Sequence, residues 1–280
     1  MDKDNKISFE ILEHFQISSP VFIEKTQIAT IWKVTQSIGG YAALKLYDNR
    51  DMKNESAGFP FLQSLNGMAS AKIYAIRKGE ALMEWLDGPS LGDLTRSGQD
   101  KIANTELIKV ANLIHRAPLD IKTELPKIES LFEALFQLQF HQTCPTSVHS
   151  DLLYCKEVAR DLLATQVDVR PLHGDLHHDN IRLGQRGYCA FDAKGVMGER
   201  AYELANAFRN PKDAVDIVQD PQRVLYLAET WSQGFGVDQQ RLLKWAMVKC
   251  ALSIAWRSKG MLENDPELPL LSLLRVNQIS

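Results

Sequence analysis

Three polar side chains with distinctive spacing stand in residues 171–192. Asp175 is followed by Asn180 five residues later, and by Asp192 twelve residues after that. The apolar runs between the last two read as a hairpin that would bring all three groups together. Phosphoryl transfer needs one carboxylate to accept a hydroxyl proton, and an amide and a second carboxylate to hold magnesium against nucleotide phosphates. The spacing therefore predicts Asp175 as the proton acceptor, and Asn180 and Asp192 as magnesium ligands.

The same stretch is also rich in side chains that bind zinc. These are His173, Asp175, His177, His178 and Asp179. A metal hydrolase is therefore a second interpretation. Against it, no further His-rich cluster follows downstream, and a zinc site would leave Asn180 and Asp192 without a role. Taken singly, His177 and His178 are equally well explained as loop residues that bond turn backbone.

The sequence of this stretch resembles that of the aminoglycoside/hydroxyurea antibiotic resistance kinases, which have a protein-kinase-like fold. Gly174 stands between His173 and Asp175, where protein kinases carry arginine. The resemblance continues through Asn180, Asp192, Lys194, Gly195, Gly198, Glu199, Arg200, Ala201, Tyr202, Leu204, Ala205, Asn206, Arg209, Asn210 and Pro211. It implies an α+β, two-lobed fold with a small β-rich N-lobe and a larger, mostly helical C-lobe. It also implies ATP and Mg²⁺ as cofactors and a small hydroxyl-bearing molecule as acceptor.

The composition is that of a soluble globular protein. The chain has 280 residues, of which 45% are hydrophobic and 24% charged, with a net charge of −3. No run of Lys and Arg is interleaved with aromatics, so we expect no nucleic-acid partner. Residues 1–6 lead into no long apolar stretch, so we expect neither a signal peptide nor a membrane span, and a cytoplasmic location. The four scattered cysteines predict reduced thiols.

The periodicity places a β-rich N-lobe over residues 1–86. Its expected parts are a short helix over 7–17, three strands within 21–47, a helix over 52–65, and strands over 71–77 and 80–85. These make a five-stranded sheet, with the helix over 52–65 beside it. The helical C-lobe would then occupy residues 87–280 and carry the catalytic and metal loops with the acceptor pocket.

Lys45 lies between two leucines in the third expected strand, so its side chain should leave the sheet on the opposite face. Alone it reads as an ordinary surface lysine. The resemblance implies instead that it binds the α and β phosphates, with Glu55, ten residues on, as its ion-pair partner. We therefore expect Lys45, Asn180 and Asp192 to line one cleft close to Asp175.

Two further nucleotide contacts are implied by the resemblance. The first turn, residues 24–30, would cover the phosphates, but it lacks glycine and offers Thr26 instead. The segment Glu84, Trp85 and Leu86 resembles the hinge between kinase lobes, whose backbone would contact adenine. For the Trp85 side chain we expect core packing.

The second half of the chain is predicted to be mostly helical. Amphipathic segments cover 101–117, 127–140, 149–165, 198–209, 221–234 and 238–258. Glu199 is expected to cap the helix over 198–209 or to bridge Arg200. The aromatic residues Trp231, Phe235, Trp245 and Trp256 are expected in the core. The later acids are expected to be solvated, although one or two of them could face a cationic substrate. They are Asp213, Asp216, Asp220, Glu229, Glu263, Asp265 and Glu267.

The sequence therefore predicts a kinase that transfers the γ-phosphoryl group of ATP to a hydroxyl of a small molecule. An aminoglycoside such as streptomycin, hydroxyurea, and another metabolite are all compatible acceptors, because specificity lies in the helical pocket. A pseudokinase that binds nucleotide without turnover stays open, since the first turn lacks glycine. Nothing in the sequence indicates an oligomeric state.

Overall fold

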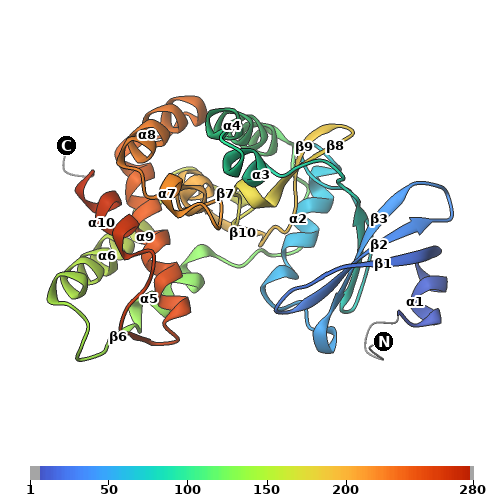
Figure 1. Cartoon of the computed structure of the whole chain (residues 1–280), viewed down its shortest axis with the longest axis horizontal. Helices are drawn as coiled ribbons and strands as arrows, with labels where there is room; N and C mark the ends of the chain where they lie inside the picture. Colours follow the sequence, from blue (N-terminus) through green and yellow to red (C-terminus); the bar gives the residue numbers. More distant parts are fainter. Residues whose placement is uncertain (1–6, 278–280) are drawn as a thin grey trace.

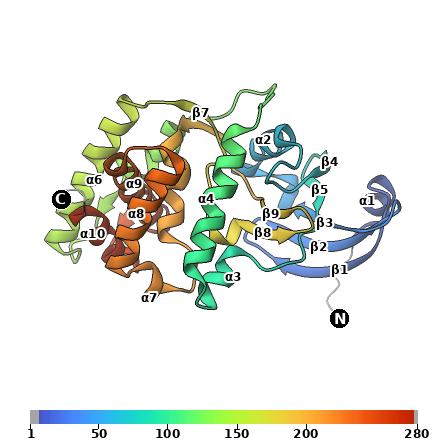
Figure 2. The ribbon, with the colours of Figure 1, turned by 90° about the horizontal axis from the view of Figure 1, so that it is seen from above.

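The computed structural model describes residues 7–277 and has two parts along its long axis (Figure 1). Strands dominate one end and helices the other. Helix α1 (Phe9–His14) lies at the outer end of the sheet, and α10 (Leu268–Val276) lies at the opposite end of the molecule (Figures 1 and 2). The predicted α+β arrangement of a β-rich lobe and a larger helical lobe is confirmed.

The β-rich lobe is built on one antiparallel sheet with the strand order β1-β2-β3-β5-β4. Its strands are β1 (Ile17–Lys25), β2 (Ala29–Gln36), β3 (Tyr41–Tyr47), β4 (Ile73–Arg77) and β5 (Glu80–Glu84). One face buries Trp32, Val34 and Leu44 under α1. Because side chains alternate along β3, Lys45 leaves the sheet on the other face. The five predicted strands are confirmed.

The predicted helix over 52–65 is wrong in its first half. Lys53–Glu55 form a 3₁₀ turn, and α2 covers only Gly58–Leu65. Pro60 explains the break, because in a continuous helix its ring would clash with the carbonyl of Ser56 and it has no N–H to donate. In the first turn of α2 the same proline is tolerated.

Helix α2 packs into the helical lobe, although it precedes residue 86 in the chain. Its Phe61, Leu62 and Leu65 belong to the large apolar cluster that the C-terminal helices form. The predicted boundary after residue 86 thus keeps all strands of the sheet in one domain. The packing of α2, in contrast, places that helix with the helical lobe. The boundary itself stays a prediction.

The helical lobe is arranged around α9, which is buried along most of its length. Its α-helices are α3 (Leu91–Arg96), α4 (Asp100–Arg116), α5 (Glu133–Phe136), α6 (Thr146–Ala164), α7 (Val215–Val218), α8 (Pro221–Phe235), α9 (Gln239–Arg257) and α10. In Figure 2, α4 stands between the sheet and the pair α8 and α9. The expected helices over 101–117, 149–165, 221–234 and 238–258 are confirmed.

Two predicted helices are confirmed only in part, because both segments are mostly of the 3₁₀ type and each includes or adjoins a short strand. Over 127–140 a 3₁₀ helix (Ile128–Phe132) and the short α5 are followed by strand β6 (Gln139–Phe140), which pairs with β11 (Met261–Leu262). The apolar residues of this segment do face the core, but pairing with the distant strand β11 holds Gln139 and Phe140 in an extended conformation. Over 198–209, strand β10 (Val196–Glu199) leads into a 3₁₀ helix (Arg200–Arg209) whose side chains are nearly all buried.

Short strands position the polar stretch. The predicted hairpin is present as β8 (Ile181–Gly184) and β9 (Gly187–Ala190). Strand β7 (Val169–Leu172) pairs with β10, so residues 173–180 and 191–195 are both attached to this ladder. Asp175, Asn180 and Asp192 therefore lie on adjoining loops.

The other expectations for the core are mostly met. Trp231, Phe235 and Trp245 are buried, whereas Trp256 is 44% exposed and was wrongly expected in the core. All four cysteines are free. Within residues 7–277, every helix is too short or too polar to cross a membrane.

Candidate active site

Lys45 lies at the centre of a buried ion-pair cluster. Its Nζ donates to Glu55 Oε2 at 2.6 Å and to Asp192 Oδ1 at 3.0 Å. Burial alone would lower the pKa of Lys45, but the two carboxylates raise it above its ordinary value. The expected ion pair between Lys45 and Glu55 is thus present, and a permanent ammonium group faces the loop that carries Asp192.

Glu55 is held by two further groups to which the sequence analysis gave no such role. The Tyr47 hydroxyl donates to Oε2 at 2.6 Å, and Lys194 Nζ donates to Oε1 at 3.3 Å. Burial would raise the pKa of Glu55, but Lys45 and Lys194 lower it below its usual range. Glu55 is therefore an ionised group that fixes both lysines.

The backbone before Asp175 is clamped by Glu203, which sequence reasoning missed. This buried carboxylate accepts the N–H groups of His173 at 2.8 Å and Gly174 at 3.0 Å, and it bonds His115 Nε2 at 3.0 Å. Gly174 has φ +77°, and a Cβ there would lie 2.8 Å from Val196 Cγ2. Glycine between His173 and Asp175 is therefore required by both backbone conformation and space.

His173 joins the two functional loops. Its Nε2 donates to the carbonyl of Phe191 at 3.0 Å, while Nδ1 accepts the N–H of Asp175 at 3.3 Å. This pair of bonds requires the neutral Nε2–H tautomer. Burial lowers the pKa of His173, which agrees with a neutral ring. His173 therefore orients the loops and holds no titrating proton at neutral pH.

Asp175 is half-buried and ionised. Asn206 Nδ2 donates to its Oδ1 at 2.8 Å. Burial would raise the pKa of Asp175, but His177, Lys249 and Lys194 lower it below its ordinary value. Because burial lowers the pKa of His177 itself to about 4, that ring is neutral at pH 7. The two ammonium groups therefore keep Asp175 ionised at neutral pH.

Asn180 and Asp192 present oxygen atoms to one space. Asn180 Nδ2 donates to the carbonyl of Asp175 at 3.0 Å, and no donor among the described residues bonds its Oδ1, which can therefore bind a cation. Both side chains border a hollow of about 520 Å³, here called the acidic hollow. Its lining is Glu55, Arg96, Asp175, His177, Asp179, Asn180, Asp192, Lys194, Lys212 and Asp213. Carboxylate and amide oxygens are ligands that Mg²⁺ prefers, so these residues fit a magnesium ion.

A second hollow, of about 220 Å³, lies between the sheet and the hairpin and is here called the lobe cleft. Its lining includes Ala43, Lys45, Met83, Glu84, Trp85, Leu86, Phe191 and Asp192. Among residues 7–277, no partner accepts the backbone N–H of Leu86, so that donor is free for a ligand. The Glu84 side chain is occupied by Arg186 and by the N–H of Lys72.

Trp85 does not pack in the core as expected. It is half-buried and borders the lobe cleft, with Lys33 Nζ 4.9 Å from the centre of its ring. Strand β5 ends at Glu84, so the residues after it are free to line the opening.

Thr26 closes the first turn. Its Oγ1 accepts the N–H groups of Ile28 at 3.3 Å and Ala29 at 3.0 Å, and its own N–H bonds the carbonyl of Ala29 at 2.8 Å. Thr26 is not among the residues that border the lobe cleft. The hydrogen bonds of the Thr26 hydroxyl therefore close this turn. A phosphate contact by Thr26 stays a prediction.

The comparisons with known proteins bear on this arrangement. The family model of the aminoglycoside/hydroxyurea antibiotic resistance kinases matches residues 14–260. The chain belongs to this family. It is 33% identical over 213 residues to streptomycin 3''-kinase from Klebsiella pneumoniae, covering 72% of this chain and 76% of that protein. The predicted resemblance is confirmed.

Solved structures share the fold of this antibiotic resistance kinase. A choline/ethanolamine kinase family protein from Mesorhizobium loti has a TM-score of 0.67 at 10% identity, covering 97% of this chain and 90% of that one. An aminoglycoside phosphotransferase in complex with ADP and hygromycin B has a TM-score of 0.62 at 10% identity, covering 95% and 97%. The protein-kinase-like fold is confirmed, and the chain is an ATP-dependent small-molecule kinase.

The hydrolase interpretation is not favoured in this kinase. Within residues 7–277, no group of three or more His, Cys, Asp or Glu side chains could hold a metal ion. His177 Nδ1 accepts the N–H of Asp179 at 3.2 Å, and His178 Nε2 bonds Asn104 Oδ1 at 2.8 Å. Both histidines therefore serve the loop structure. Family membership likewise does not favour the pseudokinase interpretation.

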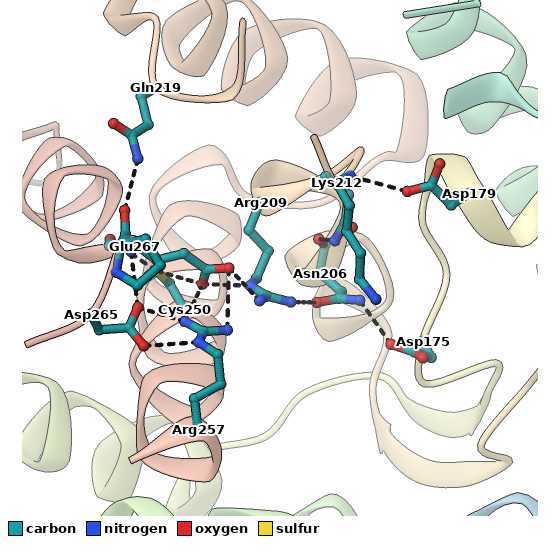
Figure 3. Close-up of polar contacts among 12 residues, drawn as sticks. Asp175, Asp179, Asn206, Arg209, Lys212, Gln219, Cys250, Arg257, Asp265 and Glu267 are labelled. Atoms are coloured by element: carbon teal, nitrogen blue, oxygen red, sulfur yellow. Dashed lines mark hydrogen bonds and ion pairs between the residues drawn. The ribbon is translucent and has the colours of Figure 1, made fainter. Parts of the chain in front are cut away.

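A chain of polar contacts runs from Asp175 to the turn before α10 (Figure 3). Asn206 links Asp175 to Arg209, whose Nη1 donates to Asn206 Oδ1 at 3.0 Å. Arg209 Nε donates to Glu267 at 2.9 Å, and Glu267 also pairs with Arg257 at 3.0 Å. Asn206 and Arg209 belong to the stretch that resembles the family, but only the fold reveals that they connect Asp175 to Glu267.

Several acids differ from expectation. Glu267 is paired, and Asp265 is buried against Arg257, so neither is a solvated charge. Glu199 neither caps the following helix nor bridges Arg200, because it pairs with Arg241 from α9. Tertiary partners distant in sequence decide the role of each of these acids.

Removing the Asn206 amide should slow the reaction without weakening nucleotide binding. We expect Asn206→Ala to lower kcat roughly 10- to 100-fold, because a hydrogen bond to a charged group contributes about 1.5–3 kcal/mol. The KM for ATP should stay within about twofold, since Asn206 lies outside the lobe cleft. Steady-state kinetics with a thermal melt measures both.

Asn210→Ala is the matched control for this variant. Asn210 is also buried, and its Nδ2 donates to the carbonyl of Asn206 at 2.8 Å without touching Asp175. Equal losses of kcat in the two variants would contradict a positioning role for Asn206 and indicate general destabilisation.

Proposed function

We propose that this kinase transfers the γ-phosphoryl group of MgATP to a hydroxyl of an antibiotic, either an aminoglycoside such as streptomycin or hydroxyurea. The observation that carries the proposal is the position of Asp175, which borders two separate hollows. One is the acidic hollow. The other measures about 480 Å³, contains Lys53, Glu124, Lys194, Lys249 and Trp256 in its lining, and is here called the lysine hollow.

In this proposal the nucleotide spans the lobe cleft and the acidic hollow, which share Asp192, and the acceptor lies in the lysine hollow. Adenine lies in the lobe cleft against the backbone of residues 84–86, and the phosphates extend past Lys45 into the acidic hollow. The acceptor occupies the lysine hollow and offers its hydroxyl to Asp175. The Asp175 carboxylate, which borders the acidic hollow and the lysine hollow, then receives the hydroxyl proton as the acceptor oxygen attacks phosphorus.

The charged residues each receive a role in the same proposal. Magnesium, when bound, would neutralise phosphate charge, and Asn180 and Asp192 would hold it. Lys45 binds the α and β phosphates, and Glu55 keeps its ammonium group in place. The first turn covers the phosphates, with Thr26 shaping its backbone. We also propose a cytoplasmic location, where ATP is available.

An acceptor screen tests the proposal. Purified protein with ATP and Mg²⁺ should consume ATP when streptomycin, a second aminoglycoside or hydroxyurea is added, and mass spectrometry should show a phosphorylated acceptor. Omitting Mg²⁺ should abolish the reaction. Polyol and amino-alcohol metabolites belong in the same screen.

The outcome separates the possible acceptors. Phosphorylation of a metabolite, with neither hydroxyurea nor any aminoglycoside turned over, would refute the antibiotic acceptor and retain the kinase. A variant lacking Lys45, such as Lys45→Met, serves as the inactive control, because it removes the cation that faces the phosphates.

A further inference from the structure

Lys249 has an unusual environment. It lies in the middle of α9, is only 4% exposed, and borders the lysine hollow together with Asp175. Its ammonium faces two aromatic rings, with Nζ 4.5 Å from the centre of Trp256 and 6.0 Å from that of Tyr202. Within residues 7–277 it makes neither a hydrogen bond nor an ion pair. Leaving such a group buried costs folding free energy.

The other buried lysines show what is missing. Lys45 pairs with two carboxylates, and Lys156 donates to the carbonyls of Phe136 and Leu138 at 3.2 and 2.8 Å. Lys194, on the same hollow, pairs with Glu55. Among these lysines of the described chain, Lys249 alone makes no hydrogen bond and no ion pair, and it borders the space where the acceptor of the proposed function would lie.

The charge state of Lys249 is maintained at neutral pH. Burial lowers its pKa to about 8, Arg209 and Lys194 lower it as well, and Asp175 and Glu267 raise it. Below that pH the ammonium form dominates. An ammonium has three donors and no acceptor, so a partner must present oxygen and not a protonated amine.

We propose that Lys249 is a specificity-determining residue of the acceptor site, which selects acceptors carrying a second oxygen on the atom next to the one that bears the reacting hydroxyl. This inference rests on the proposed function, because it assigns the acceptor to the lysine hollow. One oxygen meets Asp175 and its neighbour meets Lys249. A vicinal diol and the hydroxyl–carbonyl pair of hydroxyurea both have this form.

The same geometry rejects the nitrogen analogue. A protonated amine or guanidinium placed at Lys249 would meet a like charge, with Lys194 also on the lining. It would also leave the buried ammonium without a partner. Discrimination therefore has an attractive part and a repulsive part.

Matched acceptor pairs test the inference. One pair is hydroxyurea and N-hydroxyguanidine, and the other is a sugar glycoside and the same sugar with an amine replacing one of two neighbouring hydroxyls. We expect the wild type to favour the oxygen member roughly 10- to 100-fold in kcat/KM, as for a hydrogen bond to a charged group. Lys249→Met should bring the ratio close to one, mainly by raising the KM of the oxygen member.

Lys53→Met is the matched control. It removes the same charge from the same hollow, but Lys53 is exposed, so solvent screens it and the ratio should be kept within about twofold. If Lys249→Met lowers both members of a pair equally, Lys249 acts only on Asp175 or on folding, and the inference is wrong.

Failure of the proposed function is recognised separately. A wild type that phosphorylates the sugar but no antibiotic refutes the antibiotic acceptor, while the ratio on the sugar pair still decides the role of Lys249. If nothing is phosphorylated, calorimetry with a non-hydrolysable ATP analogue measures binding of the same pairs. Tighter binding of the oxygen member that Lys249→Met abolishes supports the inference, and equal or undetectable binding overturns it.

Discussion

Asp175→Asn should lower kcat on the order of 10²- to 10⁴-fold while nucleotide affinity stays nearly unchanged. A positioned general base contributes a factor of this size, roughly 3 to 5 kcal/mol of barrier. The variant keeps an oxygen that can accept the Asn206 amide, which in the wild type lies 2.8 Å from Oδ1. Asp175 lies outside the lobe cleft, so ATP loses no contact there. Single-turnover kinetics and ATP titration measure the two quantities.

Asp179→Asn provides the comparison for this variant. Asp179 lies four residues on and borders the same acidic hollow, but its oxygens bond Arg96 at 2.9 Å and the N–H of Lys212 at 3.1 Å. It should change stability more than chemistry. If Asp175→Asn kept more than a tenth of wild-type kcat, Asp175 would not be the proton acceptor.

Asp192→Asn should abolish magnesium-dependent turnover with little change in thermal melting. The substitution keeps the volume of the side chain and removes the charge that is proposed to hold the cation. Lys45 loses the charge of its partner at 3.0 Å but retains the Glu55 carboxylate at 2.6 Å, so the buried ammonium stays paired. We expect a loss of at least about 10²-fold in kcat at saturating ATP, and a magnesium titration that no longer saturates.

Asp213→Asn removes an equal charge from the same acidic hollow. The Asp213 side chain is exposed and is not proposed to bind the cation. The magnesium titration of this variant should therefore match that of the wild type. Retention of full activity by Asp192→Asn would exclude it as the metal ligand.

The sequence was most informative where function constrains spacing. Asp175, Asn180 and Asp192 were predicted on adjoining loops because a hairpin of fixed length joins two of them, and the fold has that hairpin. Lys45 could be assigned to one face of β3 because side chains alternate along a strand. The family resemblance then supplied Glu55, whose ion pair with Lys45 no spacing rule would have identified.

The failures have identifiable physical causes. Pro60 excludes a continuous helix over 52–65, although the apolar spacing of Ala57, Phe61 and Leu65 is helical. Glu203 and Lys249 lie on regular-looking helical segments, where a buried charge cannot be distinguished from a solvated one without knowing what packs against it. Glu199 likewise finds Arg241 only through the tertiary fold.

The packing of α2 bears on how often this site is assembled. Glu55 immediately precedes a helix whose Phe61, Leu62 and Leu65 are buried in the helical lobe. Swinging that helix outward to separate Glu55 from Lys45 would expose all three side chains, at roughly 1.5 to 3 kcal/mol each. A total of about 4.5 to 9 kcal/mol would leave fewer than about one molecule in a thousand in such an open form at equilibrium. The enzyme should therefore be constitutively competent, because the pair of Lys45 and Glu55 is assembled without an activating modification.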